Sequence, residues 1–374
     1  MHNSSIVYSK EYVKTEFKIG DLKVQGAILY MLDIPLSNVF TISLGSQDRY
    51  RGIIVELRTE KDFGFGEGAT EHRITGEIPE AIFYNSMFIL KTFNGKNFES
   101  IEDFESNVDS SMYAGSVSKN AISIAIHDLI AKVYGVHSSI LLGGSHEERV
   151  TSLTIPIGSV ENNLKVLKDY QKKGARIIKI KVGKDAEIDK KRITAIADNL
   201  NKGERFYADA NQGYGFKDAV EIGSLLSEKG ALFFEQPMNR NDLRKLRDLR
   251  KKVNIPIALD ESISSPYDVL NAIMYEAADI VNVKLTKSGG IRNAFKSLAV
   301  AQAYGIDGMV GCMVESKLGI SAGLALANSL KNVKYVDLDG FMDLTFQPFE
   351  KGVLYKEGKI APEKGTGFAT LKNF

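Results

Sequence analysis

Two lysines separated by one residue, Lys179 and Lys181, are the first groups in this sequence that could do chemistry. They lie in the apolar stretch 177–182, whose β-branched residues predict a buried strand. Because side chains alternate along a strand, both ammonium groups share one face. On a buried strand this favours a polar site, where two cations lower each other's pKa and one becomes a usable base. An edge strand with both lysines in solvent fits the same pattern.

Carboxylates end the next three strand-like segments along the chain. Asp209 follows segment 205–208, Glu235 ends segment 232–235, and Asp260 follows segment 257–259. A single carboxylate in such a place is commonly the N-cap of the next helix. Three of them on neighbouring strands repel one another and need a cation, and oxygen ligands without His or Cys favour Mg²⁺ over zinc. The pattern therefore predicts a magnesium site.

A further lysine, Lys284, follows segment 280–283, so lysines are expected on both sides of the predicted metal. Bases on both faces of a metal-bound carboxylate are what two-sided exchange of an α-proton requires. One base removes the proton, Mg²⁺ and a neighbouring lysine stabilise the enediolate, and the other base returns a proton to the opposite face. All five histidines precede residue 150, so both bases of such a site would be lysines.

The elements that position these residues repeat regularly. From Val150 onward, eight short apolar segments alternate with amphipathic ones, and markers in successive segments are 24 to 28 residues apart. One βα unit has about that length, and eight in a row predict a TIM-type barrel with catalytic groups at the C-terminal ends of its strands. The last segment, 335–338, is followed by no clear helix. We therefore expect an α/β fold with a modified TIM barrel of (β/α)7β type over residues 151–340.

The first 150 residues have a different texture. Segments 24–30, 39–44 and 52–58 predict three antiparallel strands, with turn residues at 45–48, and helical periodicity runs from about 77 to 135. These features predict an α+β capping domain over 1–150, to which the tail 341–374 returns; residues 1–20 fit either an extra strand or an extension. The alternating glycines of 64–68 lack the βαβ context of a dinucleotide loop, so a flexible loop or strand end is expected.

The composition of the 374-residue chain, with 44% apolar and 25% charged residues, is that of a soluble globular protein. A net charge of +1 gives no electrostatic reason to bind nucleic acid or an anionic membrane, and no apolar run is long enough to span a bilayer. The N-terminus lacks the apolar core of a secretory signal, and the one cysteine, Cys312, excludes an internal disulfide. These features predict a cytoplasmic protein.

Taken together, the motifs resemble the enolase superfamily, in its muconate-lactonising branch, over nearly the whole chain. The matching motifs are Lys-Ile-Lys at 179–181, Asp-Ala-Asn-Gln-Gly at 209–213, Glu-Gln-Pro at 235–237, Asp-Glu-Ser at 260–262 and Val-Lys-Leu-Thr-Lys-Ser-Gly-Gly-Ile at 283–291. Asp337-Leu338-Asp339 is similar to the Asp-x-Asp pair of dipeptide epimerases. Alternation would place both carboxylates on one face, where they can hold an α-ammonium group. A structural role for two aspartates in a turn remains the alternative.

The resemblance implies that an L-Ala-Xaa dipeptide is epimerised at the α-carbon of its C-terminal residue. Asp209, Glu235 and Asp260 would hold Mg²⁺, which would bind the substrate carboxylate. Lys181 and Lys284 would be the acid–base groups for the (R) and (S) faces. Lys179 would contact the substrate carboxylate and polarise it. The other implied substrate contacts are Thr154, Asp337, Asp339, and Cys312 with the nearby Glu315. A homo-oligomer is expected by analogy with the family.

One departure from the family concerns the side chain of Xaa. Members specific for Ala-Glu carry an arginine in the first capping loop, and the matching position here is Gly45, with Arg49 and Arg51 further along. We therefore expect a broad or partly apolar Xaa preference, with Ala-Glu still a candidate. One alternative is another reaction on this scaffold, by a cycloisomerase, acid-sugar dehydratase or succinylbenzoate synthase, whose substrates lack an ammonium group. The other is a non-catalytic metal-binding barrel.

Overall fold

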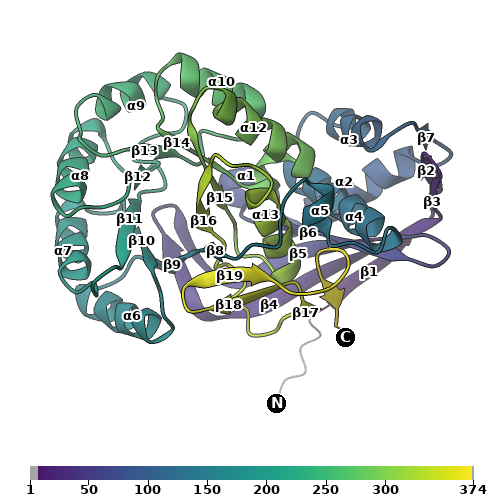
Figure 1. Ribbon diagram of the computed structural model, residues 1–374, viewed down its shortest axis with the longest axis horizontal. Helices are drawn as coiled ribbons and strands as arrows, with labels where there is room; N and C mark the ends of the chain where they lie inside the picture. Colours follow the sequence, from purple (N-terminus) through teal and green to yellow (C-terminus); the bar gives the residue numbers. More distant parts are fainter. Residues whose placement is uncertain (1–6, 373–374) are drawn as a thin grey trace.

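A computed structural model, which describes residues 7–372, has an eight-stranded parallel barrel beside a smaller α+β unit (Figure 1). The barrel strands pair in chain order, and Ser152 Oγ donates to Asp337 Oδ1 at 2.7 Å, which brings the first strand beside the last. They are β9 (Ser152–Ile155), β10 (Ile177–Lys181), β11 (Arg205–Asp209), β12 (Phe234–Glu235), β13 (Ile257–Leu259), β14 (Ile280–Val283), β15 (Asp307–Gly311) and β16 (Val333–Asp337). No helix follows β16 in the chain up to residue 372, so the predicted (β/α)7β-type barrel is confirmed.

Helices alternate with the barrel strands and form the outer ring seen in Figure 1. Several begin at a polar side chain that caps the first turn; Asp185, for example, accepts from the backbone N–H groups of Glu187 and Ile188. Each cap marks the start of a helix that follows a barrel strand. The helices are α6 (Val160–Lys172), α7 (Ala186–Ala197), α8 (Phe216–Glu228), α9 (Leu243–Arg250), α10 (Pro266–Met274), α11 (Leu285–Ser288), α12 (Ile291–Ala303) and α13 (Lys317–Ala327).

Apolar side chains fill the lower part of the barrel interior. Tyr207, Phe233, Ala258, Ile280 and Met309 form one buried cluster, in which the rings of Tyr207 and Phe233 stack with their centroids 4.2 Å apart. Because this cluster closes the barrel from below, the polar side chains at the C-terminal ends of the strands face a separate space above it.

The smaller unit contains an antiparallel sheet in the order β1 (Val7–Val13), β4 (Gly26–Ile42), β5 (Gly45–Arg58) and β6 (Phe63–Ala69). The prediction of separate strands at 24–30 and 39–44 was wrong, because β4 spans most of both segments. The predicted turn at 45–48 was also wrong, because the turn lies at 43–44 and β5 begins at Gly45. The far end of β4 is held by the barrel, where Ile157 N donates to Thr41 O at 3.0 Å. The chain at 7–13 forms the extra strand that was one of two alternatives for residues 1–20, of which 1–6 lie outside the described residues.

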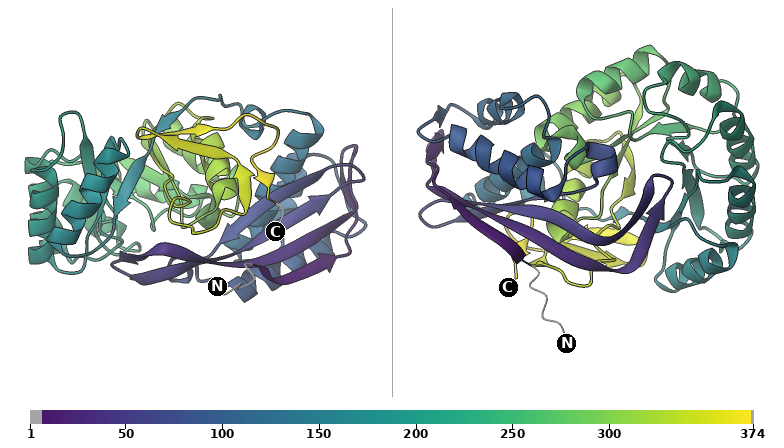
Figure 2. Two further views of the ribbon diagram at one scale, coloured as in Figure 1. Left: turned by 90° about the horizontal axis from the view of Figure 1, so that it is seen from below. Right: turned by 180° about the vertical axis from the view of Figure 1, so that it is seen from behind.

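Helices cover one side of this sheet: α2 (Pro79–Thr92), α3 (Ile101–Ser110) and α4 (Ser116–Val133), preceded by the short α1 (His72–Thr75) (Figure 2). The alternating glycines lie inside strand β6, so the expectation of a loop or strand end was wrong. A Cβ on Gly64 would collide with Ala125 O and one on Gly66 with Ala121 O, whereas one on Gly68 would lie 3.0 Å from Val117 O. The two-residue step of the strand thus matches the four-residue step of α4, and glycine lets the backbones approach.

We expect Gly66→Ala to lower the free energy of unfolding by about 3 kcal/mol or more, because the methyl group meets helix backbone that cannot move aside. Gly68→Ala should have a clearly smaller effect, because its Cβ would lie 3.0 Å from Val117 O, whereas the Cβ of Gly66→Ala would collide with Ala121 O. Urea unfolding followed by circular dichroism measures both. Equal losses in the two variants would contradict this account of the glycine spacing.

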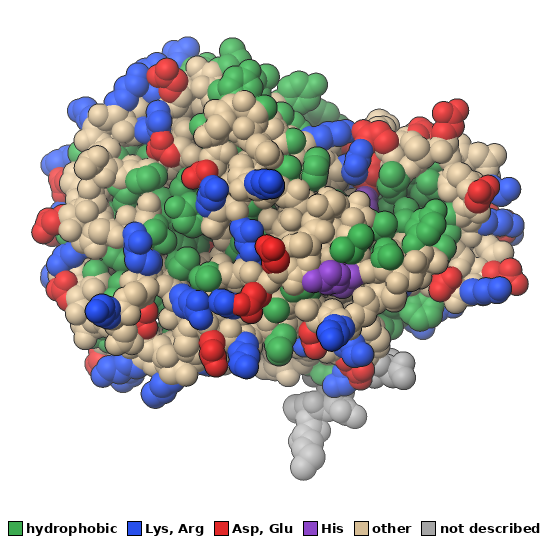
Figure 3. Space-filling view, in the orientation of Figure 1, with side chains coloured by type: hydrophobic (Ala, Val, Ile, Leu, Met, Phe, Trp, Pro, Cys, Tyr) green, Lys and Arg blue, Asp and Glu red, His purple; other side chains and the backbone are tan. Residues whose placement is uncertain are grey.

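The C-terminal tail contacts both parts of the molecule. Its strands are β17 (Phe349–Lys351), β18 (Val353–Lys356), β19 (Lys359–Pro362) and β20 (Thr370–Leu371). Strand β19 pairs with β8 (Arg149–Val150), and the ring of Phe349 lies 5.8 Å from that of Phe65 in β6. Within residues 7–372, no helix is long and apolar enough to cross a membrane. On the face drawn in Figure 3, side chains of both charge signs are interspersed.

Candidate active site

A cavity lies at the C-terminal ends of the barrel strands, between the barrel and the capping unit. Besides Glu315, ten site residues were predicted from the sequence, and seven of them line it: Thr154, Lys179, Lys181, Lys284, Cys312, Asp337 and Asp339. The other three, Asp209, Glu235 and Asp260, contact the lysines that line the cavity. The structure therefore brings all ten residues into one site.

Lys181 and Lys284 approach this site from opposite sides. Lys181 is the last residue of β10, and Lys284 directly follows β14. These strands are four places apart in the eight-stranded ring, which places them across the barrel from each other. A small molecule between the two ammonium groups would therefore present opposite faces to them.

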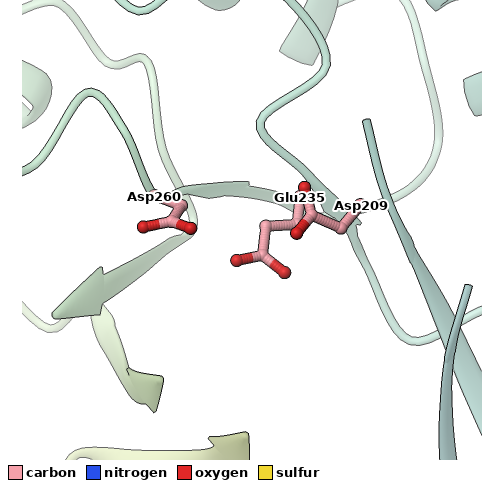
Figure 4. A group of neighbouring side chains, drawn as sticks. All are labelled: Asp209, Glu235 and Asp260. Atoms are coloured by element: carbon pink, nitrogen blue, oxygen red, sulfur yellow. The ribbon is translucent and has the colours of Figure 1, made fainter. Parts of the chain in front are cut away.

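The three predicted metal ligands form one buried carboxylate cluster, to which Asp209, Glu235 and Asp260 each offer an oxygen within 4.8 Å of the others. Figure 4 shows their carboxylates gathered at the ends of three neighbouring strands. All three residues are fully buried. Asn282 Nδ2 donates to Glu235 Oε1 at 2.6 Å, which orients that carboxylate.

Lysines balance the charge of this cluster. Lys179 Nζ lies 3.0 Å from Asp209 Oδ2 and 3.0 Å from Glu235 Oε2, and Lys181 Nζ lies 2.7 Å from Asp209 Oδ2. On the far side, Lys284 Nζ lies 2.8 Å from Asp260 Oδ2. Each carboxylate therefore has at least one ammonium neighbour, which makes a buried cluster of three acids tolerable.

The pKa values of these carboxylates diverge. Burial, reinforced by the negative charge of Asp209, raises the pKa of Glu235 to about 8. Burial also acts to raise the pKa of Asp209, but Lys179 and Lys181 outweigh it and lower the pKa to about 2. Burial acts to raise the pKa of Asp260 as well, but Lys284 and Lys287 outweigh it, so this pKa is also lowered. The surroundings therefore favour the charged form of Asp209 and Asp260 and the uncharged form of Glu235.

The expectation that two neighbouring lysines lower each other's pKa is wrong for Lys179. Burial acts to lower the pKa of Lys179, but Asp209, Asp337 and Glu235 hold it well above its usual value. The pKa of Lys284 is raised for the same reason, with Asp260 as the main partner. The attraction of the clustered carboxylates exceeds the mutual repulsion of the lysines, so the pKa of Lys179 and Lys284 depends on what neutralises those carboxylates.

The donor set fits Mg²⁺. Glu235 Oε2 and Asp260 Oδ2 are buried and make no hydrogen bond within the described residues, although each faces a lysine across an ion-pair distance. Two buried carboxylate oxygens without hydrogen bonds, close to a third carboxylate, are suited to a small divalent cation. No His or Cys belongs to the cluster, which disfavours zinc.

The two aspartates on the β16 side are not equivalent. Asp337 ends β16 and is fixed at both oxygens, with Ser152 Oγ at 2.7 Å from Oδ1 and Lys179 Nζ at 2.7 Å from Oδ2. Asp339 lies beyond the strand, is less deeply buried, and accepts from Thr154 N at 2.8 Å. Burial and the charge of Asp337 raise the pKa of Asp339 to about 7. A ligand ammonium group would favour its ionised form.

Cys312 lines the cavity, and burial holds the pKa of its thiol well above the usual value, so the thiol is uncharged there. Glu315 is buried and accepts from Met313 N at 2.9 Å. Burial and the nearby Glu67 raise the pKa of Glu315 to about 8. Glu315 is not among the described residues that line the cavity.

Several residues of the site were missed in the sequence. Asn211 Oδ1 accepts from Lys181 Nζ at 3.0 Å, and the place of Asn211 in the Asp-Ala-Asn motif was a usable signal. Lys287 donates to Asp260 from behind the cluster. Gln47 and Glu71 reach the cavity from the capping unit, and no periodicity marked them. Arg49 and Arg51 pair with Asp33 and are not among the described lining residues.

Comparison with known proteins gives a consistent result. A sequence model of the family described as enolase C-terminal domain-like matches residues 164–370. The chain is 31% identical to the L-Ala-D/L-Glu epimerase of Clostridium acetobutylicum, over 94% of this chain and 99% of that protein. It is 32% identical to the hydrophobic dipeptide epimerase of Enterococcus faecalis, over 89% and 94% of the two chains. The solved dipeptide epimerase of Cytophaga hutchinsonii, complexed with Mg and D-Ala-L-Val, has 30% identity and a TM-score of 0.89, covering 93% of this chain and 96% of that one.

Proposed function

We propose that this chain, which belongs to the enolase C-terminal domain-like family, is a Mg²⁺-dependent isomerase that epimerises L-Ala-Xaa dipeptides at the C-terminal residue. The observation that carries the proposal is one cavity with lysines from opposite sides of the barrel and an aspartate pair on a third wall. Acid–base groups on both faces of an α-carbon are the requirement for inverting it.

Asp209, Glu235 and Asp260 would hold the metal, as their buried, closely spaced oxygens suggest. When bound, Mg²⁺ supplies electrostatic stabilisation of the negative charge that builds up on the substrate carboxylate. Lys179 adds to it, because its ammonium group lies against two of these ligands and remains charged.

Lys181 and Lys284 carry the proton transfer. Lys284, as the neutral amine, takes the α-proton from the (S) face, and Lys181, as the ammonium ion, delivers one to the (R) face; in the reverse direction the roles exchange. Asn211 accepts from the Lys181 ammonium group and fixes its position. Both lysines are almost completely buried, which excludes bulk water as a competing proton donor.

Asp337 and Asp339 bind the N-terminal ammonium group of the dipeptide, and Thr154 and Cys312 contact the substrate beside them. Because Asp337 is already bound by Lys179 and Ser152, Asp339 makes the more direct contact and Asp337 supports it. The apolar residues Phe40, Ile42 and Ile74 cover the cavity, which supports a broad or partly apolar Xaa preference.

The test is deuterium exchange from D₂O into the α-position of L-Ala-Xaa dipeptides, with and without Mg²⁺. Exchange and epimerisation that require Mg²⁺ are expected. Their absence from every dipeptide would favour a non-catalytic barrel or another reaction of this scaffold. A strict preference for Ala-Glu over Ala-Ala, Ala-Phe and Ala-Lys would overturn the broad preference.

Replacing both Asp337 and Asp339 with asparagine is expected to reduce kcat/KM for dipeptides by about 100-fold or more, because a charge-assisted contact to the ammonium group is lost. Asp339→Asn alone should act mainly by raising KM, since this residue lies away from the lysines' proton transfer. N-acetyl-L-Ala-Xaa, which lacks the ammonium group, should be a poor substrate of the unaltered enzyme. Unchanged dipeptide turnover in the double variant would favour a cycloisomerase, dehydratase or succinylbenzoate synthase.

Two further properties belong to the proposal. A single cysteine allows no internal disulfide, which suits a cytoplasmic location. Assembly into a homo-oligomer is inferred by analogy with the fold family. Light scattering of the purified protein measures its assembly directly, and a monomer at micromolar concentration would refute that part.

A further inference from the structure

The capping unit contributes one charged side chain to the cavity. Of the five described residues it places there, Phe40, Ile42 and Ile74 are apolar, Gln47 is neutral, and Glu71 is an acid. The C-terminal tail adds Asp343, on the side of Asp339. Among the described residues, the cover formed by the capping unit combines apolar surface with a single carboxylate, that of Glu71. Neither the metal nor the proton transfer uses this carboxylate.

Glu71 lies over the half of the barrel mouth that is opposite the aspartate pair. It directly precedes α1, which contacts α11 after β14, and Arg240, which follows β12, donates to Ile74 O at 3.3 Å. Asp337 belongs to β16, which is four places from β12 in the eight-stranded ring. A dipeptide held by its ammonium group at Asp337 and Asp339, with its α-carbon between the lysines, therefore has the Glu71 side free for the side chain of Xaa.

An ion pair with Arg73 holds the Glu71 carboxylate in place. Arg73 Nη1 lies 3.2 Å from Glu71 Oε1 and 3.3 Å from Oε2, and Arg73 Nη2 donates to Ser46 O at 2.8 Å. The guanidinium group lies directly over Gly45, where a Cβ would approach its Cζ to 2.9 Å. The arginine is not among the described residues that line the cavity, so the carboxylate is the member of the pair that a ligand meets.

We infer that this site selects dipeptides whose C-terminal residue carries a positively charged side chain, lysine or arginine, over those with an acidic one. The inference rests on the proposed epimerase function and names the substrate class within it. Ile42 and Ile74 cover the aliphatic stem of such a side chain, and Glu71 binds its charged end. Gln47 Nε2 donates to Arg49 O at 2.7 Å, which leaves Gln47 Oε1 as an acceptor. The side chain of an acidic Xaa would lie closer to Glu71 than to Arg73, because only Glu71 of this pair lines the cavity, and the two carboxylates would repel each other.

The experiment compares kcat/KM for L-Ala-L-Lys, L-Ala-L-Leu and L-Ala-L-Glu in the unaltered enzyme and in Glu71→Gln, measured by deuterium exchange with Mg²⁺ present. We expect L-Ala-L-Lys to exceed L-Ala-L-Glu by at least about 10-fold in the unaltered enzyme. Glu71→Gln should lower kcat/KM for L-Ala-L-Lys by about 10- to 100-fold, mainly through KM, and leave L-Ala-L-Leu within about threefold. Gln can still accept hydrogen bonds from Arg73, so the local fold is preserved.

Glu80→Gln is the matched control, because Glu80 is an exposed acid of the same unit outside the cavity, and it should change none of the three substrates. The lysine advantage should also shrink as salt is added. Equal losses for L-Ala-L-Lys and L-Ala-L-Leu in Glu71→Gln would overturn the inference, and so would a preference for L-Ala-L-Glu. In both cases turnover of L-Ala-L-Leu would show that epimerisation itself stands. Absence of exchange from all three dipeptides would overturn both proposals.

Discussion

Lys181→Ala is expected to abolish α-proton exchange from L-Ala-D-Xaa while L-Ala-L-Xaa continues to exchange without inversion. The reason is the position of the two lysines on strands that face each other across the barrel, so that each reaches one face of the α-carbon. Lys284 can still remove and return a proton at the (S) face, but no group remains to protonate the other. Loss of a positioned acid–base group lowers a rate by about 10² to 10⁴-fold, and epimerisation in both directions should fall by at least that much.

Lys284→Ala provides the mirror-image experiment, with exchange lost from L-Ala-L-Xaa and retained from L-Ala-D-Xaa. Proton NMR in D₂O resolves exchange from inversion for each diastereomer. Lys181→Met, which keeps most of the side-chain volume beside Asp209, should behave like Lys181→Ala and excludes a packing effect. Loss of exchange from both diastereomers in each single variant would show that the lysines do not divide the work by face.

Glu235→Gln is expected to remove Mg²⁺-dependent activity, by about 10³-fold or more, without destabilising the metal-free protein. Burial and the charge of Asp209 raise the pKa of Glu235 to about 8, so this carboxyl is largely uncharged in the metal-free protein at neutral pH. Gln resembles that uncharged form, and its amide oxygen still accepts from Asn282. The thermal midpoint without metal should therefore stay the same or rise. The increase in midpoint that Mg²⁺ gives the unaltered protein should disappear, because binding to the folded state is its source.

Glu261→Gln is the matched control for this measurement. Glu261 is a buried acid adjacent to Asp260 but outside the carboxylate cluster, and it accepts from Asn211 Nδ2 at 3.2 Å. The stabilisation by Mg²⁺ should persist in this variant. Chelation of the unaltered enzyme should reproduce the loss of activity seen in Glu235→Gln. A Glu235→Gln protein that is still stabilised by Mg²⁺ would place the metal elsewhere.

The barrel half of the site could be predicted from the sequence because its signals are local. Lys179, Lys181, Asp209, Glu235 and Asp260 each stand at the end of a short apolar segment, in the same phase of a two-residue alternation. A parallel barrel brings all such ends to one rim, so position along the chain translates into position in space. The structure places these residues together as predicted.

The capping half could not be predicted in the same way. Strand β4 joins two segments that were predicted as separate strands, and its far end is bound by the barrel through Ile157. Glycine is required in β6 because the backbone of α4, 49 to 61 residues further along the chain, lies directly against it. Glu71, Arg73 and Gly45 form one arrangement across two elements, and none of the three is distinctive alone.

The sequence by itself thus determined the (β/α)7β-type barrel, the lysine pair, the three carboxylates and the opposing Lys284, since each depends on strand periodicity and on the order of strands in a closed sheet. Tertiary structure decided the charge state of those groups and what covers them. Asp337 and Asp339 look alike in the chain, but only Asp337 is held by Lys179, because charge balance in a buried site depends on three-dimensional distance. The cover of the cavity was decided in the same way, by contacts between segments that carry no common pattern.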